Sequence, residues 1–192
     1  VKPDYRMKSY YSDYSQGFPL MLKQLYSEYI DLWISNDNPA KNLLNFPFGN
    51  LLLRIHNRNI NETNEVYSLS DCCIPVIHRL ICKVNGELGF CDKDAFEWNI
   101  GNVYDGLDLE NIKDIINKFN TICSSLCVNC WAIRFCRCCF SFASTGSKLS
   151  VEKMREFCIR NKKSVEIALQ MYVEIMEKNP KAFENNIYMK TN

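Results

Sequence analysis

Apolar residues recur at helical spacing in three stretches of the chain. The first stretch has Pro19 in its opening turn, and its apolar positions are Phe18, Leu22, Leu25, Tyr29 and Leu32. The second starts at Asp108, runs to about position 120, and would bury Leu109, Ile112, Ile115, Ile116 and Phe119. The third starts at the N-cap residue Ser150, runs to about position 177, and would bury Met154, Phe157, Cys158, Val165, Leu169, Tyr172 and Met176. The pattern therefore predicts an N-terminal helix, a short central helix and a long C-terminal helix.

A β-hairpin is predicted between the first two helices. Asn85-Gly86 lies between two short apolar stretches, and this dipeptide is favoured in a two-residue type I′ turn. In that register Cys82 opposes Gly89, and Cys82 shares a face with Cys91 as a diagonal pair, with Cα atoms ~7–8 Å apart. Such a pair is too widely spaced for a relaxed disulfide but could hold one metal cluster. The residues that follow, 99–106, are rich in turn formers and predict a link without regular structure.

Composition narrows the class of protein without assigning a function. Apolar residues make up 47% and charged residues 23% of the chain, as in ordinary globular proteins. The net charge of +1 shows no electrostatic preference, so nucleic acid is not an expected partner. No window reaches the ~18 consecutive apolar residues of a membrane span. Residues 1–15 are polar and rich in tyrosine and do not look like a signal peptide, so we expect a cytoplasmic protein without a membrane partner.

The eleven cysteines are the outlying feature of this sequence. An odd number of cysteines without an export signal argues against a disulfide framework. Six of them fall within residues 123–139, which is too short a segment to cross-link distant parts of a fold. Metal ligation is the use of cysteine that brings so many thiolates together.

Spacing divides eight of these cysteines into two sets of four. A C-x2-C turn directs two thiolates at one centre, and it fits zinc and iron–sulfur clusters equally well. A third cysteine after five further residues and one from the C-terminal helix complete what we call the second thiol set: Cys127, Cys130, Cys136 and Cys158. The remaining candidates form the first thiol set: Cys73, Cys82, Cys91 and Cys139. Cys72, Cys123 and Cys138 are left outside both sets.

These patterns predict an α+β protein in which a small hairpin-and-loop cage holds two cysteine-ligated metal sites. Residues 1–70 would form a helical segment, residues 71–160 the metal-binding domain, and residues 161–192 a helical extension with a tail. His56 and His78 have no partners at ligand spacing, so structural roles are predicted for both. Ordinary packing is predicted for Trp131, inside the cysteine-rich loop.

The order of the cysteines resembles the SPASM domain, the auxiliary-cluster domain of many radical SAM enzymes, especially peptide maturases. The similar residues are Cys73-Ile-Pro, the Gly86-x4-Cys91 motif, the Ile100–Gly106 link, the C-x2-C-x5-C core from Cys127, and the lone Cys158. The resemblance covers roughly residues 70–160. The sequence departs from the family at position 140, where Phe140 occurs in place of the last cysteine of the core.

The resemblance implies two 4Fe–4S clusters. The second thiol set would ligate the second auxiliary cluster, and Cys73, Cys91 and Cys139 would ligate the first, with Cys139 preferred over Cys138. Cys82 as the fourth ligand depends on the hairpin register, and without it the first cluster has an open iron that a substrate thiolate could occupy. Whether Cys72 or Cys73 is the ligand stays open.

The implied function is that of an auxiliary cluster domain that transfers electrons or binds a substrate thiol. The enzyme would modify a cysteine-containing precursor peptide, and the radical SAM barrel would be a partner in the same or a separate chain. Cys123, Cys127 and Cys130 fit the C-x3-C-x2-C triad of the SAM-cleaving cluster, but too few residues follow for a barrel of ~200 residues. No complete catalytic centre is therefore predicted here. The alternatives are a zinc-binding interaction module without a redox role and a small electron carrier of the ferredoxin type.

Overall fold

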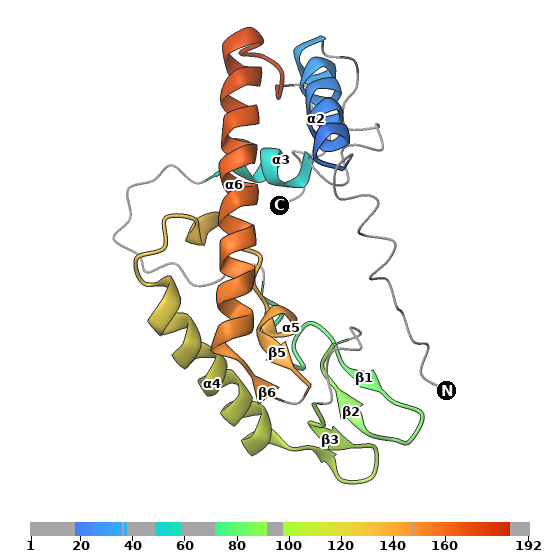
Figure 1. The fold of residues 1–192 in the computed structure, drawn as a ribbon. Helices are drawn as coiled ribbons and strands as arrows, with labels where there is room; N and C mark the ends of the chain where they lie inside the picture. The colour runs from blue at the N-terminus through green and yellow to red at the C-terminus, as the bar shows by residue number, and fades with distance from the viewer. Residues whose placement is uncertain are drawn as a thin grey trace. The chain divides into compact units, whose positions relative to one another are not determined.

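The protein is an α+β structure built of helices and small antiparallel sheets. A computed structural model describes residues 18–35, 37, 49–58, 72–91, 98–146 and 148–184, and these contain the elements drawn in Figure 1. The chain divides into two compact units, one of Val1–Ile60 with Ile167–Asn192 and one of Asn61–Glu166. In the described ranges no helix is long and apolar enough to cross a membrane. The predicted α+β class is therefore confirmed, whereas these elements alone do not show the predicted metal cage.

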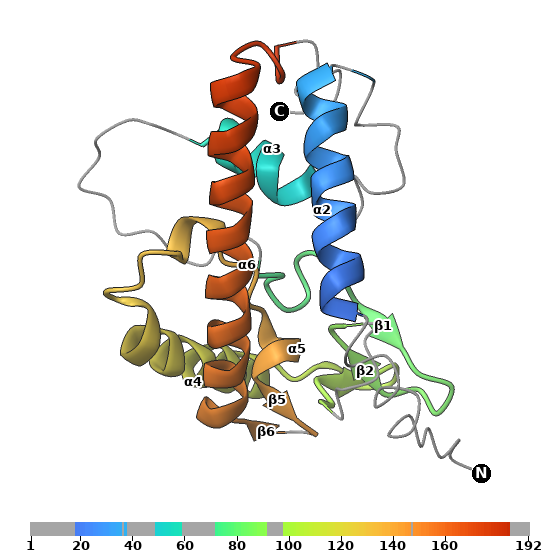
Figure 2. The same cartoon turned by 45° about the horizontal axis from the view of Figure 1, so that its top comes forward.

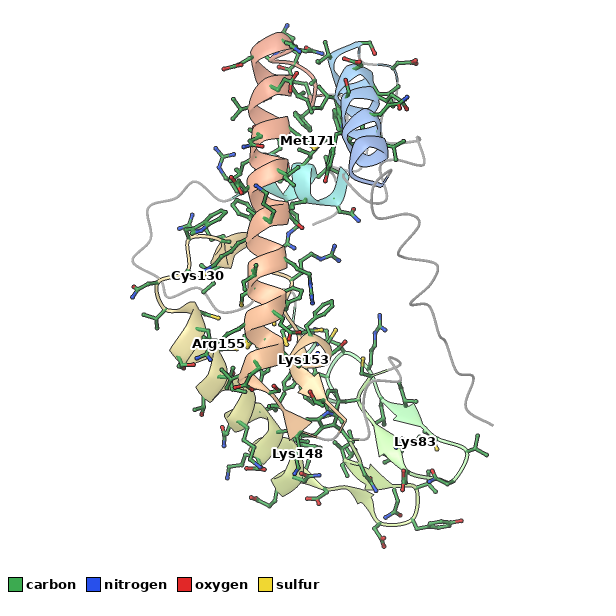
Figure 3. The ribbon with its side chains drawn as sticks, viewed as in Figure 1. Lys83, Cys130, Lys148, Lys153, Arg155 and Met171 are labelled. Atoms are coloured by element: carbon green, nitrogen blue, oxygen red, sulfur yellow. The ribbon has the colours of Figure 1, made fainter. Side chains whose placement is uncertain are left out.

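The unit formed by the two ends of the chain contains α2 (Phe18–Ser35), α3 (Asn50–His56) and the later turns of α6 (Val151–Lys178). The predicted N-terminal helix is confirmed, although the side chains of its first six residues lie outside the description. The short apolar run at 51–55, which periodicity alone leaves unassigned, forms α3. Figure 3 labels one α6 residue of this unit, Met171, which is buried together with Tyr29, Ile30, Trp33, Leu52, Ile55, Ile175 and Phe183.

Aromatic rings hold this unit together. The ring centroids of Trp33 and Phe183 lie 4.2 Å apart, and His56 stacks on Phe183 at 4.8 Å. His56 Nδ1 lies 3.1 Å from the Tyr172 hydroxyl. The Asn179 side chain donates hydrogen bonds to the carbonyl oxygens of Trp33 at 3.3 Å and Ile34 at 3.1 Å, which satisfies acceptors at the C-terminal end of α2. The structural role predicted for His56 is therefore a packing role.

The unit of Asn61–Glu166 depends on α4 (Leu109–Cys127). Asp108 caps the helix, because its carboxylate accepts a hydrogen bond from the Asn111 backbone N–H at 3.0 Å. The predicted helix ended near position 120, but α4 runs on for about two more turns. Cys123 and Cys127 are thereby helical residues four positions apart, which places them on one face. Leu109, which we expected to be buried, is exposed at the start of the helix.

The long helix α6 begins as predicted at Ser150, whose hydroxyl accepts a hydrogen bond from the Lys153 N–H at 3.2 Å. Its first half buries Met154, Phe157 and Val165 as expected. In its second half the buried residues are Ala168, Met171 and Ile175, and the predicted Leu169, Tyr172 and Met176 are only half-buried. The buried stripe is therefore displaced by one residue from the prediction in the part of α6 that belongs to the unit with α2 and α3.

The predicted hairpin exists, but its predicted register is wrong. In strands β1 (Ile81–Cys82) and β2 (Leu88–Gly89), Cys82 pairs with Leu88, and Ile81 pairs with Gly89. Gly86 has a φ of 83° and its N–H donates to the Lys83 oxygen at 2.9 Å, so the loop has three residues instead of two. Since a one-residue change in register moves a side chain to the other face, Cys82 and Cys91 are not the predicted same-face pair.

The link at 99–106, expected to be irregular, forms a second hairpin of β3 (Gly101–Asn102) and β4 (Gly106–Leu107). Hydrogen bonds from Ile100 N to Leu88 O at 2.9 Å and from Val103 N to Gly86 O at 3.0 Å join it to β2. A third hairpin, which the sequence analysis did not predict, consists of β5 (Ser144–Thr145) and β6 (Lys148–Leu149) and precedes α6. All three pairs have two residues per strand, which is too short for a recognisable alternating pattern.

Among the glycines of these hairpins, Gly101 is the one whose replacement by a larger residue we expect to destabilise the fold most. It has a φ of 138°, and a Cβ at this position would collide with the Gly106 carbonyl oxygen. We expect Gly101→Ala to lower the free energy of unfolding by at least about 2 kcal/mol, measured by urea denaturation. Gly89→Ala is the matched control, because its Cβ would meet the Trp98 oxygen at an ordinary 3.7 Å. Equal stability of the two variants would contradict this account of the second hairpin.

The stability of the protein is predicted to fall when the solution becomes mildly acidic. Burial, and secondarily the nearby Arg58 charge, lower the pKa of His56 below 6.5. The unfolded chain therefore binds this proton more readily, and His56 favours folding fully above pH ~6.5 and progressively less below it. Chemical unfolding between pH 8 and pH 5 should show this loss, and His56→Phe should reduce it. A loss of the same size in His56→Phe would assign the pH dependence to other groups.

Candidate metal centre

The segment after α4 folds into a series of tight turns that carry two cysteines of the second thiol set, and a third, Cys127, is the last residue of α4. The Cys130 N–H donates to the Cys127 oxygen at 3.0 Å, and the Cys136 N–H donates to the Ile133 oxygen at 3.1 Å. Between them lies a 3₁₀ turn, Ile133–Phe135. Figure 3 shows Cys130 on this segment, immediately beyond the end of α4. The C-x2-C-x5-C spacing is thus folded back on itself, as a shared ligand site requires.

Cys158 comes to the same place on a different element. It lies in the first half of α6, next to the buried Phe157 and one turn beyond the fully buried Met154. Figures 1 and 2 both show α4 passing beside the beginning of α6. Met154 and Phe157 belong to one core with Ile115 and Phe119 of α4, so apolar packing holds the two cysteine-bearing helices together.

The thiols of the second set interact with one another. Burial raises the pKa of Cys136 to about 11, a hydrogen bond from the Cys138 N–H at 3.4 Å opposes that change, and the charges of Cys158, Cys127 and Cys130 raise the pKa further. Ionised neighbours therefore disfavour the ionisation of Cys136, Cys127 and Cys158. These electrostatic interactions connect all four predicted residues, whereas their role as ligands of one centre stays a prediction.

Lys162 is a cation near these thiols. Burial raises the pKa values of both Cys127 and Cys158, as do neighbouring cysteines, and the positive charge of Lys162 partly offsets the change in each. Lys162 is one helical turn beyond Cys158 on α6 and was not a sequence candidate. Its charge favours the thiolate form, which is the form that ligates metals.

Among the residues that the structure describes, no three or more Cys, His, Asp or Glu side chains are arranged to hold one metal ion. Neither thiol set thus forms a recognisable metal-binding group in this part of the chain, and ligand roles for these cysteines stay predictions.

Fewer interactions connect the cysteines of the first thiol set than those of the second. Cys139 precedes α5 (Phe140–Ala143), and Cys91 is half-buried against the same core as Cys158. Cys73 and Cys82 are exposed, and the Cys82 thiol donates to the Lys83 oxygen at 3.5 Å. The geometric argument for Cys82 as fourth ligand fails with the predicted register, because Leu88 instead of Gly89 lies opposite it.

Cys138 and Cys139 have distinct environments. Cys138 is 0% exposed, and burial raises its pKa strongly. Cys139 is half-buried and lies near Cys72, whose pKa its charge raises. The choice of Cys139 over Cys138 for the first set is consistent with these positions.

Two cysteines that spacing left aside belong to the same neighbourhood. Cys123 donates a hydrogen bond to Cys127, and burial is the largest cause that raises its pKa to about 12. Cys72 interacts with Cys123, Cys139 and Cys73. The prediction ended this helix near position 120 and so missed the contact, although Cys123 and Cys127 have the i, i+4 spacing of one helix face.

Two further sequence candidates, Trp131 and His78, have simpler roles. Trp131 is 56% exposed, so the expected packing role is wrong. The His78 ring accepts a hydrogen bond from the Ile74 N–H at 3.1 Å and stabilises the turn after the Cys72-Cys73 pair, in agreement with a structural role.

Comparisons with protein families, curated proteins and solved structures gave no match to this chain.

Thiol accessibility predicts an order of alkylation in the reduced, metal-free protein. Cys73 and Cys82 are exposed, whereas Cys136 and Cys138 are buried and have raised pKa values. We expect iodoacetamide at pH 8 to modify the first two at least about tenfold faster, because the thiolate is the reactive form. Peptide mass spectrometry over time measures the rates. Rapid modification of Cys138 would be incompatible with its position in the core.

Proposed function

We propose that the unit Asn61–Glu166 is an auxiliary iron–sulfur-binding domain of the SPASM type. One observation carries the proposal: electrostatic interactions link Cys127 at the end of α4, Cys130 and Cys136 on the loop after it, and Cys158 on α6. Four thiols correspond in number and kind to the Cys₄ ligand set of a 4Fe–4S cluster, and Cys127, Cys136 and Cys158 also lie in or against one core.

The surroundings of the second thiol set fit such a group. The Cys138 N–H already donates to the Cys136 sulfur, and hydrogen bonds to sulfur are a known determinant of cluster potential. Lys162 supplies a positive charge beside Cys127 and Cys158. The apolar core behind the thiols limits the access of water, a second determinant of that potential.

In the first thiol set we carry over Cys91, Cys139 and a cysteine of the Cys72-Cys73 pair from the family resemblance. Cys82 no longer has geometric support, so this set would supply three protein thiolates. A first cluster bound in this way would have one iron open to a substrate thiolate, as the sequence analysis allowed.

When bound, the clusters supply one-electron transfer, and the chain's residues hold, shield and tune them. The domain would act with a radical SAM barrel, in the same or another chain, on a cysteine-containing precursor peptide. It would do so in the cytoplasm, without nucleic acid or membrane as a partner. No residue of this chain is assigned a catalytic role, so the chemical step belongs to the barrel.

Anaerobic reconstitution tests the proposal. We expect about eight irons and eight acid-labile sulfides per chain, with the brown colour of 4Fe–4S clusters. Cys136→Ser should reduce the iron to about four, because it removes a ligand of the second set. Cys138→Ala is the matched control and should leave the iron content unchanged, with circular dichroism showing that both variants fold. A colourless protein with zinc and without sulfide would instead support the zinc-binding interaction module.

A further inference from the structure

The first two hairpins of the cysteine-rich unit form one four-stranded meander with two outer edges (Figure 1). A bridge between Glu87 and Asn102 and the two backbone hydrogen bonds between the hairpins join them in the order β1-β2-β3-β4. Among the residues that the structure describes, β4 pairs with β3 alone. In this part of the chain, one side of β4 is therefore a strand edge without a neighbour.

The backbone of Leu107 points toward this open edge. The Asp108 N–H donates to the Ile100 oxygen at 2.8 Å, so Asp108 directs its backbone groups at β3. Because hydrogen-bonded and non-hydrogen-bonded pairs alternate along an antiparallel ladder, the adjacent pair of Leu107 and Gly101 is not hydrogen-bonded. The N–H and C=O of Leu107 consequently point away from β3, in the position where an added strand would bind.

The side chains around this edge are apolar and exposed. Tyr104 is 90% and Leu109 67% exposed, and Val103 and Leu107 are exposed as well. These four large apolar side chains lie within an unbroken run of eight exposed residues, 103–110. A contiguous exposed apolar surface of this kind is typical of an interaction site.

The charges of the same eight residues determine what the edge can bind. They contain three carboxylates, Asp105, Asp108 and Glu110, and no lysine or arginine. The Asn102 side chain donates to Asp105 at 2.8 Å and Asp108 caps α4, so hydrogen bonds hold two of the carboxylates without neutralising them. Lys113 lies 3.9 Å from Glu110, and both side chains are exposed. The negative charge beside β4 therefore favours a positively charged partner and disfavours a second copy of the same edge.

We propose that the β4 edge and residues 103–110 bind a basic peptide, which adds to the sheet as an extended fifth strand. The peptide backbone would pair with the N–H and C=O of Leu107, and its apolar side chains would cover Tyr104 and Leu109. Its lysine or arginine side chains would face the three carboxylates. The sheet and the start of α4 form this surface, so the inference does not depend on the proposed cluster chemistry.

Binding of synthetic peptides to the full chain tests the inference. The probe is a short fluorescein-labelled peptide of alternating lysine and valine, and fluorescence anisotropy at low salt measures its affinity. We expect saturable binding that is at least about fivefold weaker when glutamate replaces lysine or when every backbone nitrogen of the peptide is methylated. Equal binding of the three peptides, or no binding of the lysine–valine peptide, would overturn the proposal.

Two double variants separate this site from a general attraction between charges. Asp105→Asn with Glu110→Gln should weaken binding of the lysine–valine peptide at least about fivefold. Glu156→Gln with Glu166→Gln is the matched control, because it removes two exposed carboxylates from α6 in the same unit, and it should leave the affinity unchanged. Equal losses of affinity in the two double variants would overturn the proposal.

The outward N–H of Leu107 gives a further test. Leu107→Pro removes this donor and should weaken peptide binding at least about threefold, with circular dichroism to show that the variant folds. If it does not fold, the two double variants still decide the question. Analytical ultracentrifugation identifies another occupant, because a wild-type dimer that Leu107→Pro converts to monomers would assign the edge to a second copy and overturn the proposal.

Discussion

The apolar contact between α4 and the first half of α6 is the interaction on which the rest of the cysteine-rich unit depends. Ile112, Ile115 and Phe119 from α4 share one buried core with Met154 and Phe157 from α6. This core supplies an attraction that the thiols cannot supply themselves, since ionised cysteines repel one another and burial opposes their charge. Hydrophobic burial therefore assembles the thiols, and the chemistry proposed for them follows from that position.

The same burial connects metal binding to protons. Thiols with raised pKa values are neutral at neutral pH, and each must lose its proton to become a ligand. A bound metal group would take over the role of these protons, by giving the buried sulfurs a positive partner. Lys162 and the backbone N–H donors at Cys136 and Cys72 already act in this direction. These interactions only partly offset burial, so the pKa values of these thiols remain raised.

The parts of the fold that the sequence predicted well are those with long periodic patterns. α2, α4 and α6 were expected from apolar spacing, and the N-cap at Ser150 forms as predicted. Local rules failed where tertiary contacts compete with them. The Asn85-Gly86 turn gained a residue as β2 paired with the second hairpin. The final turns of α4 continue the apolar stripe with Ile122 and Leu126, and the prediction ended before them.

The sequence by itself predicted the second thiol set, because the C-x2-C-x5-C spacing and the inward helix face that bears Cys158 are both local patterns. Only the tertiary structure decided the surroundings of the first set, the separation of Cys72 from Cys73 and the position of Cys123 beside Cys127. The physical reason is the range of the interactions. Spacing along a loop or helix is a local property, whereas strand register and burial depend on contacts with residues far away in the chain.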